Sequence, residues 1–168
     1  MKKTLMILTL TLLSSAAMAD ISSFVGQYTL TAKNEVAGAE CFIDIQIANL
    51  NGYGTTIDLS YIYQIGNGHM PISTSLLVSA VLDGADRVHA GSHDATSATK
   101  HYDKATLSND VLTMKTKYTP RLFGIPLGFE SDTYSFIQDK ATGMLKSKRV
   151  LQTNLVSKTS QCVYKKVN

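Results

Sequence analysis

The sequence predicts a single all-β domain, namely an antiparallel up-and-down β-barrel of about 8 to 10 strands closed by one disulfide. Three observations lead to this fold class. Apolar and polar residues alternate with a period of two over much of the chain, which is typical of half-buried strands. Clusters of Gly, Asn and Asp, which form turns, separate the alternating runs. Two cysteines, Cys41 and Cys162, lie near the two ends of the expected domain.

Residues 1–19 have the three parts of a secretory signal peptide. Lys2 and Lys3 form the positive start, a short apolar run follows, and Ala17-Met18-Ala19 supplies the cleavage pattern. The run is too short to span a bilayer, which takes roughly 20 apolar residues. We therefore expect cleavage at the end of this segment and a periplasmic or secreted domain over residues 20–168.

The cysteines are expected to form the one disulfide, because two thiols in an oxidising compartment normally pair. A Cys41–Cys162 bond would tie an early strand to the last one, so these strands must come close. This favours a closed barrel. A two-sheet sandwich is the alternative architecture, and two free, buried thiols are the alternative chemistry.

The clearest hairpin pairs Cys41–Ala48 with Thr56–Ile65 across the turn signal Asn51-Gly52-Tyr53-Gly54. Segment Ser73–Leu82 is expected to be a strand, with a helical turn over a barrel mouth as the alternative. Residues 90–92 and 95–99 have the composition of surface loop. The other expected strands are Phe24–Ala32, Lys104–Leu107, Val111–Tyr118, Ser131–Gln138, Leu145–Leu155 and Ser160–Val167.

An outer-membrane barrel would show the same alternation, since the period does not reveal whether the apolar face meets a core or lipid. The composition opposes that interpretation. The chain has no Trp, aromatic girdles are not evident, and the last expected strand carries Lys165 and Lys166. We expect a domain that does not span the membrane.

The segment Phe24-Val25-Gly26-Gln27-Tyr28 resembles the opening strand of the lipocalin-like (calycin) barrels, with Gly26 and Tyr28 at the family's Gly and aromatic positions. Ser131-Asp132-Thr133-Tyr134 is loosely similar to the family's Thr-Asp-Tyr turn, with an inserted Thr. Arg149 would imitate the basic residue that packs over the first-strand aromatic. The resemblance implies an up-and-down barrel whose cavity holds a small apolar or amphipathic molecule.

The alternating strands supply the candidate ligand-binding residues. Tyrosines suit such a lining because they pair an apolar ring with a hydroxyl that can orient a ligand. The ordinary alternative is that the same side chains fill a solid core. The predicted lining is Ile43, Ile45, Ile47, Ile57, Leu59, Tyr61 and Tyr63.

Residues 122–129 are an unusual apolar stretch, because two glycines and one proline interrupt five large apolar side chains. We interpret this segment as a flap over a barrel mouth or a patch that meets a membrane or partner, with Phe123 and Phe129 as further ligand contacts. A packed loop or a bulged strand is the ordinary explanation of such a segment.

Three of the four histidines, His89, His93 and His101, lie close together in the chain and are the candidate metal ligands. Their spacing matches no compact metal motif, so a solvated loop is the preferred interpretation. Ser92-His93-Asp94 cannot act as a triad, because adjacent residues do not converge. No catalytic motif is present, and no cofactor is expected.

Basic residues concentrate at the end of the chain. Residues 140–168 contain seven Lys or Arg and no acid, within a total of 16 basic and 13 acidic residues. Such a segment can attract an anionic surface or an envelope protein. Pairing of these strands beside acidic strands of the same sheet is the preferred explanation. Nucleic acid is not an expected partner, because aromatic and basic residues do not interleave.

These features together predict an exported protein that carries a small apolar or amphipathic molecule, such as a lipid, in a barrel cavity. The alternative is a protein-binding module or hydrolase inhibitor that uses its loops and basic C-terminal segment. A purely structural envelope protein is a third possibility.

Overall fold

The computed structural model describes residues 20–51, 55–64, 72–93, 97–123 and 125–167. The signal-peptide prediction falls outside these residues. The described chain begins with one turn of 3-10 helix, η1 (Ile21–Ser23). Strands follow: β1 (Gly26–Asn34), β2 (Asp44–Asn51), β3 (Thr55–Gln64), β4 (Ile72–Val81), β5 (Arg87–His93), β6 (Ser97–Ser108), β7 (Val111–Leu122), β8 (Ile125–Pro126), β9 (Glu130–Gln138), β10 (Leu145–Thr153) and β11 (Ser157–Lys166).

All strands belong to one antiparallel, barrel-like sheet, which confirms the all-β prediction. Ten strands follow the order β4-β3-β2-β1-β11-β10-β9-β7-β6-β5, and β8 pairs with β7 alone. The first and last strands pair, so the sheet closes where the two ends of the domain meet. Strands β4 and β5 are its edges, and the closure is therefore incomplete between them.

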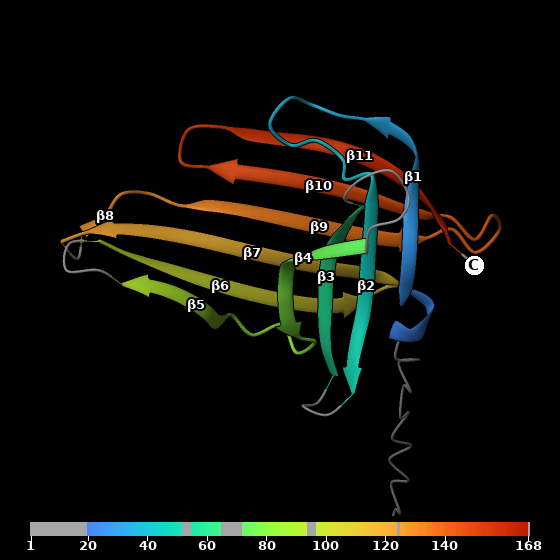
Figure 1. Ribbon diagram of the computed structural model, residues 1–168, viewed down its shortest axis with the longest axis horizontal. Helices are drawn as coiled ribbons and strands as arrows, with labels where there is room; N and C mark the ends of the chain where they lie inside the picture. Colours follow the sequence, from blue (N-terminus) through green and yellow to red (C-terminus); the bar gives the residue numbers. More distant parts are fainter. Residues whose placement is uncertain (1–19, 52–54, 65–71, 94–96, 124, 168) are drawn as a thin grey trace, which may run out of the picture.

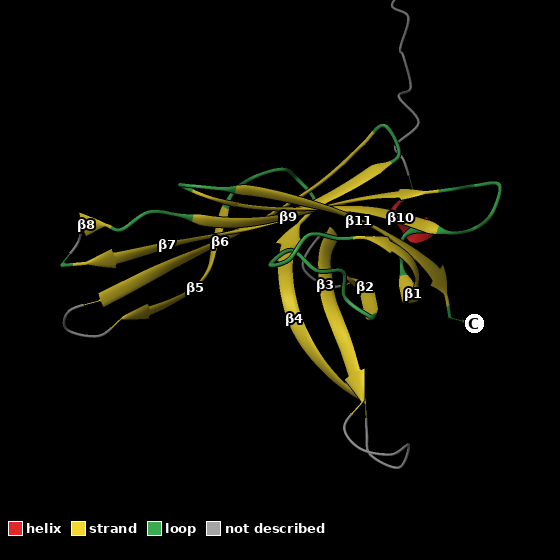
Figure 2. Ribbon diagram, turned by 90° about the horizontal axis from the view of Figure 1, so that it is seen from above, coloured by secondary structure: helices red, strands yellow, loops and turns green. Residues whose placement is uncertain are grey.

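The sheet curls so that its two halves face each other. Strands β2, β3 and β4 sweep across one face of β6, β7 and β9, whose far ends extend beyond them together with β5 (Figures 1 and 2). Across this opening, the Ser79 N–H of β4 donates to Asp103 Oδ2 of β6 over 3.4 Å. The sheet thus has a covered half and an extended, uncovered half.

Each predicted strand overlaps a strand of the structure, although the ends differ at several of them, and β5 and β8 are additions. Segment Ser73–Leu82 lies in strand β4 and not in a helical turn. Residues 90–92 and 97–99 belong to strands β5 and β6, so the surface-loop interpretation is wrong there. Backbone pairing of β5 with β6 forms this hairpin. Strands β5 and β8 together raise the number of strands above the expected range.

The core lies between the two halves of the sheet. The largest fully buried apolar side chains come from β1 to β4 on one side and from β7, β9 and β10 on the other, together with Phe24 directly after η1. This arrangement is expected when alternate residues of each strand face inward. They include Phe24, Tyr28, Ile45, Ile47, Ile57, Leu59, Val78, Leu112, Met114, Phe136 and Leu145.

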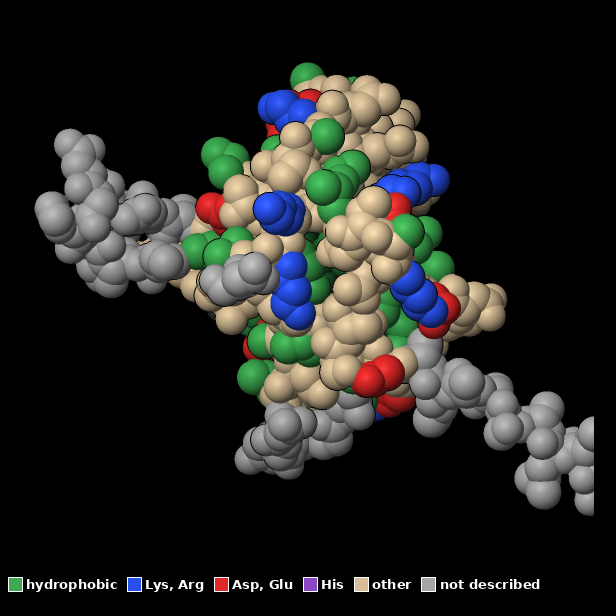
Figure 3. All heavy atoms as spheres, turned by 90° about the vertical axis from the view of Figure 1, so that its right-hand side faces the viewer, with side chains coloured by type: hydrophobic (Ala, Val, Ile, Leu, Met, Phe, Trp, Pro, Cys, Tyr) green, Lys and Arg blue, Asp and Glu red, His purple; other side chains and the backbone are tan. Residues whose placement is uncertain are grey.

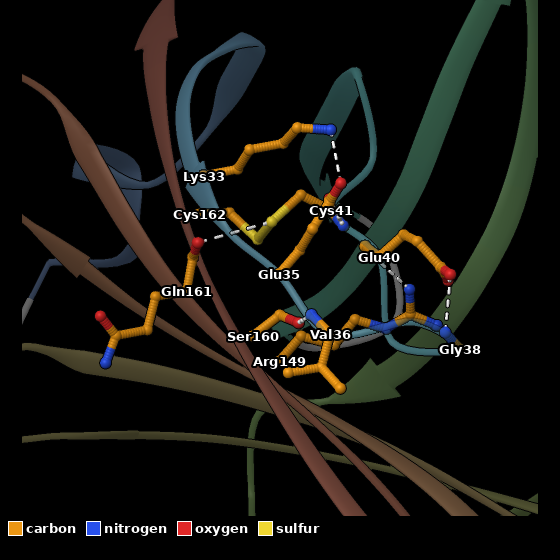
Figure 4. Close-up of polar contacts among 10 residues, drawn as sticks. All are labelled: Lys33, Glu35, Val36, Gly38, Glu40, Cys41, Arg149, Ser160, Gln161 and Cys162. Atoms are coloured by element: carbon orange, nitrogen blue, oxygen red, sulfur yellow. Dashed lines mark hydrogen bonds and ion pairs between the residues drawn. A yellow bond between two sulfur atoms is a disulfide. The ribbon is translucent and has the colours of Figure 1, made fainter.

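Cys41 and Cys162 form the expected disulfide, with an S–S distance of 2.00 Å and a Cα–Cα distance of 5.9 Å. The bond fastens the segment before β2 to β11 (Figure 4). Nearby, the Val36 N–H donates to Ser160 Oγ over 2.8 Å, and Arg149 donates to the Glu40 carbonyl over 2.5 Å. A disulfide of this kind indicates an oxidising, extracytoplasmic setting.

The end of the molecule that carries β1 and the C-terminal residues has a mixed surface. Figure 3 shows apolar side chains there in small groups, interspersed with Lys, Arg, Asp and Glu. Such a mixture is ordinary for a protein surface in contact with water. The candidate site lies at the opposite, extended end of the sheet.

Candidate ligand-binding groove

The predicted cavity lining is mostly packed core. Ile45, Ile47, Ile57 and Leu59 are each at most 2% exposed. The space that Ile45 and Leu59 share with the disulfide has a volume of about 10 Å³. That volume is about what one water molecule needs, so it cannot hold a lipid-sized ligand. The described part of this interior is therefore filled, which was the alternative to a hollow barrel.

Ile43 does not belong to the inward-facing set, because its side chain is 73% exposed. The chain bends at Ile43 before β2 begins, and the Ile43 carbonyl accepts a hydrogen bond from the Leu30 N–H over 2.8 Å. Phe42 points inward instead and stacks on Tyr61, with ring centroids 5.2 Å apart. The bend thus reverses the alternation that the sequence suggested. The side chain of Tyr63 lies outside the described residues.

A groove of about 700 Å³ lies at the extended end of the sheet. Glu130 of β9 pairs with Tyr118 of β7 on one side and with Thr153 of β10 on the other, and all three residues line the groove. Three segments therefore build it: the end of β7, the approach to β9, and the turn between β10 and β11. Its lining consists of Tyr118, Pro120, Leu127, Gly128, Phe129, Glu130, Thr153, Asn154 and Leu155.

Two local features fix the walls of the groove. The Phe129 N–H donates to Asn154 Oδ1 over 3.0 Å, which ties the segment before β9 to the β10–β11 turn. Gly128 makes this approach possible, because a Cβ at that position would lie 2.4 Å from Asn154 Nδ2. Gly128 also has φ +135°, a conformation that other residues rarely adopt. The glycine that interrupted the apolar stretch is therefore needed for the groove.

The tip beside the groove exposes large apolar side chains. Phe123 is 74% exposed and Leu155 is 92% exposed. Phe123 also has a positive φ of 49°, which is uncommon for a bulky residue and keeps its ring at the turn between β7 and β8. Leu122, Ile125, Leu127 and Val156 are exposed in the same two segments. This group of exposed apolar side chains is therefore a candidate binding surface.

The structure separates the two predicted aromatic contacts. Phe129 lines the groove, and Lys117 Nζ lies 5.2 Å from the centre of its ring. Phe123 stands at the tip and does not line the groove. Strand β8 pairs with β7 at the tip, so this part of residues 122–129 is a short hairpin and not a detached flap.

The sequence did not single out Tyr118, Pro120, Glu130 or Leu155 as site residues. Tyr118 and Glu130 belong to different strands, and only the pairing of β7 with β9 brings them side by side. The sequence did contain one indication of this site. Two apolar residues, Leu155 and Val156, follow Asn154 in a turn, where polar residues are usual.

Of the three candidate metal ligands, only His101 has a described side chain. His101 stacks on Tyr118 with ring centroids 4.4 Å apart, and its Nε2 lies 3.1 Å from Asp103 Oδ1. His89 and His93 lie on strand β5, and their side chains are outside the described set. Among the side chains that are described, no three His, Cys, Asp or Glu groups are placed to hold a metal ion.

Arg149 packs in a different place from the one implied by the lipocalin resemblance. Its guanidinium lies 4.8 Å from the Phe42 ring centre and 5.5 Å from that of Tyr134, and it pairs with Asp132. The cation over Tyr28, the first-strand aromatic, is Lys166 at 5.9 Å. Burial first, and then the negative charge of Asp132, raise the pKa of Tyr134. Arg149 therefore connects residues of the core and does not line the groove.

The chain was compared with known protein families, curated proteins and solved structures. No protein family, curated protein or solved structure matches the chain. The lipocalin-like resemblance thus rests on the sequence positions alone. In the part of the chain that is described, no helix is long and apolar enough to cross a membrane.

Proposed function

We propose that this protein is an exported binding protein that takes a small apolar or amphipathic molecule in the groove at the ends of β7, β9 and β10. The groove volume of about 700 Å³ carries the proposal, because it lies in the range of small-molecule sites and its walls are mostly apolar. The packed interior argues against the barrel cavity that the sequence suggested. Export is supported by the disulfide and by the signal-like residues 1–19.

The lining indicates what kind of molecule fits. Leu127, Phe129 and Leu155 offer apolar contact, while Glu130 and Asn154 place polar groups at the same groove. A hydrocarbon or ring system would cover the apolar walls, and a hydroxyl or amine would meet the carboxylate of Glu130. An amphipathic molecule satisfies both parts better than a purely apolar one.

The test is binding of the neutral fluorescent probe N-phenyl-1-naphthylamine to the purified protein. Each of Leu127→Ser and Leu155→Ser should weaken binding by roughly tenfold, since burying a leucine side chain contributes roughly 1.5–3 kcal/mol. Both residues are exposed, so neither change should unfold the protein. The matched control is Ile43→Ser, which removes an equally exposed apolar side chain elsewhere. Binding that all three variants leave unchanged would place the ligand somewhere other than the groove.

A protein-binding module is the second candidate, favoured by the tip. Phe123 and Ile125 are exposed and do not line the groove, so a small ligand seated there would leave them uncovered. A photo-crosslinking residue at position 123, compared with one at position 43, tests this in the native host. A single partner captured at a stoichiometric level only from position 123 would support the module. Equal capture from both positions would refute it.

A further inference from the structure

A second hollow, of about 380 Å³, lies on β6 and β7. Its β7 residues are Lys115, Lys117, Thr119 and Arg121, which alternate with the groove residues Tyr118 and Pro120. Because successive side chains of a strand point to opposite faces, the hollow is on the other face of the sheet from the groove. Its full lining is Asp86, Tyr102, Lys115, Lys117, Thr119 and Arg121.

Three cations meet in this hollow, and none of them has an acidic partner among the described residues. Lys115, Lys117 and Arg121 form no ion pair with any described residue. Arg121 Nε is buried and has no hydrogen-bond partner within the described chain. A buried donor without a partner costs free energy, and so does the gathering of like charges. An anion bound in the hollow would relieve both costs.

The described acidic residues near the hollow form other contacts. Asp86 is the one carboxylate in the lining, and its Oδ1 lies 3.9 Å from Lys104 Nζ. Asp103 of β6 is 1% exposed and faces the core, where it approaches Ser79 and His101. The strands thus place their buried acid inward and their cations outward, so the hollow has a net positive charge.

We propose that this hollow binds a phosphate or sulfate ester group. Arginine presents a planar set of donors that matches the oxygens of such a group, and lysine adds charge without requiring a fixed geometry. The hydroxyls of Tyr102 and Thr119 complete a mixed donor set. The hollow is larger than the ester group alone and has room for the part of the molecule that carries it. The inference is independent of the proposed groove ligand.

Two sources could supply this chemistry, a soluble ester or a lipid headgroup in a membrane. The position of the hollow is relevant to these two sources. Arg121 lies opposite Pro126 in the pairing of β7 with β8, and Pro126 is next to the exposed Ile125. Cations beside exposed apolar side chains are the combination that anionic membrane surfaces attract. The experiment therefore needs one arm for each source.

The soluble arm follows backbone amide NMR shifts of the purified protein during titration with inorganic phosphate and with glycerol 3-phosphate. We expect the largest shifts at residues 115–121 and at Tyr102. Arg121→Gln and Lys117→Gln should each weaken binding about tenfold, as expected for loss of one charge-assisted hydrogen bond. Absence of shifts, or shifts spread over the whole surface, would refute the site.

The membrane arm measures co-sedimentation with phosphatidylcholine vesicles, with and without phosphatidylglycerol. Binding that requires phosphatidylglycerol and is lost in Arg121→Gln identifies a lipid headgroup as the source. Binding to the soluble esters alone identifies a soluble ligand. Neither result depends on the naphthylamine probe, so failure here leaves the groove proposal intact.

Lys148→Gln is the matched control in both arms. Lys148 is exposed on β10, on the same face of the sheet as the hollow, and forms no ion pair with a described residue. The substitution removes the same charge outside the hollow. If Lys148→Gln weakens binding as much as Lys117→Gln does, the attraction is diffuse and the site is refuted. An acidic peptide that binds better than the esters would also refute it.

Discussion

Arg149 and Asp132 form a largely buried ion pair between β10 and β9. Arg149 Nη2 lies 2.6 Å from Asp132 Oδ2, and the two side chains are 14% and 12% exposed. The same carboxylate accepts a hydrogen bond from the Tyr134 hydroxyl over 2.7 Å, while Arg149 reaches the Glu40 carbonyl beside the disulfide. One guanidinium therefore links β9, β10 and the segment that Cys41 fastens to β11.

Removal of the Arg149 charge should be strongly destabilising. Arg149→Met leaves Asp132 buried without its partner, and breaking a buried pair in this way costs roughly 3 kcal/mol. The measurement is urea denaturation followed by circular dichroism. Lys140→Gln breaks the exposed pair with Asp110 and should change stability by less than about 1 kcal/mol. Similar losses in the two variants would contradict the structural role of the buried pair.

The reversal of alternation before β2 gives a matched pair of variants. Ile45→Ala should destabilise the protein by roughly 2–5 kcal/mol, because it leaves a cavity in the packed core. Ile43→Ala should change the free energy of unfolding by at most about 0.5 kcal/mol, because that side chain is already exposed. Thermal or urea unfolding of both variants checks the difference. A large loss of stability in Ile43→Ala would contradict the exposure of this side chain at the bend.

Gly128 should be less tolerant of alanine than another glycine with positive φ. Gly128→Ala must displace Asn154 and weaken its hydrogen bond to Phe129, so both stability and probe binding in the groove should fall. Gly143→Ala has φ +69° and nothing within 4 Å of the new Cβ, so it should cost only the backbone strain of about 1–2 kcal/mol. Unchanged probe binding in Gly128→Ala would show that the hydrogen bond between Asn154 and Phe129 does not contribute to ligand binding in the groove.

Three tyrosines should resist ionisation until the protein unfolds. Burial raises the pKa of Tyr28, Tyr134 and Tyr164 above the ordinary value of 10.0. Above that pH the unfolded chain loses protons that the folded chain keeps, so stability should fall as the pH rises through this range. Ultraviolet titration of tyrosinate should show these groups ionising together with unfolding. Their ionisation in a still-folded protein, seen by circular dichroism, would contradict the burial.

Much of the fold could be predicted from particular residues. The alternation around Ile45, Ile57 and Leu59 identified buried faces, and the Asn109-Asp110 and Gly143 turns fall where strands end. The bend at Ile43 could not be predicted, because a one-residue change of phase leaves the local composition unchanged while moving side chains to the other face. Strand β5 was missed for a related reason, since its Ala, Gly and Ser residues carry little strand preference and depend on pairing with β6.

The sequence by itself determined the all-β class, the disulfide partners and the approximate strands, because alternation and turn composition are local and two cysteines allow only one pairing. Only the tertiary structure decided that the inner face is packed and that β7, β9 and β10 form a groove at their ends. Both depend on side chains brought together by strand register over long separations in the chain. The hollow of Lys115, Lys117 and Arg121 has the same origin: its residues share one face of β7, but its shape comes from neighbouring strands.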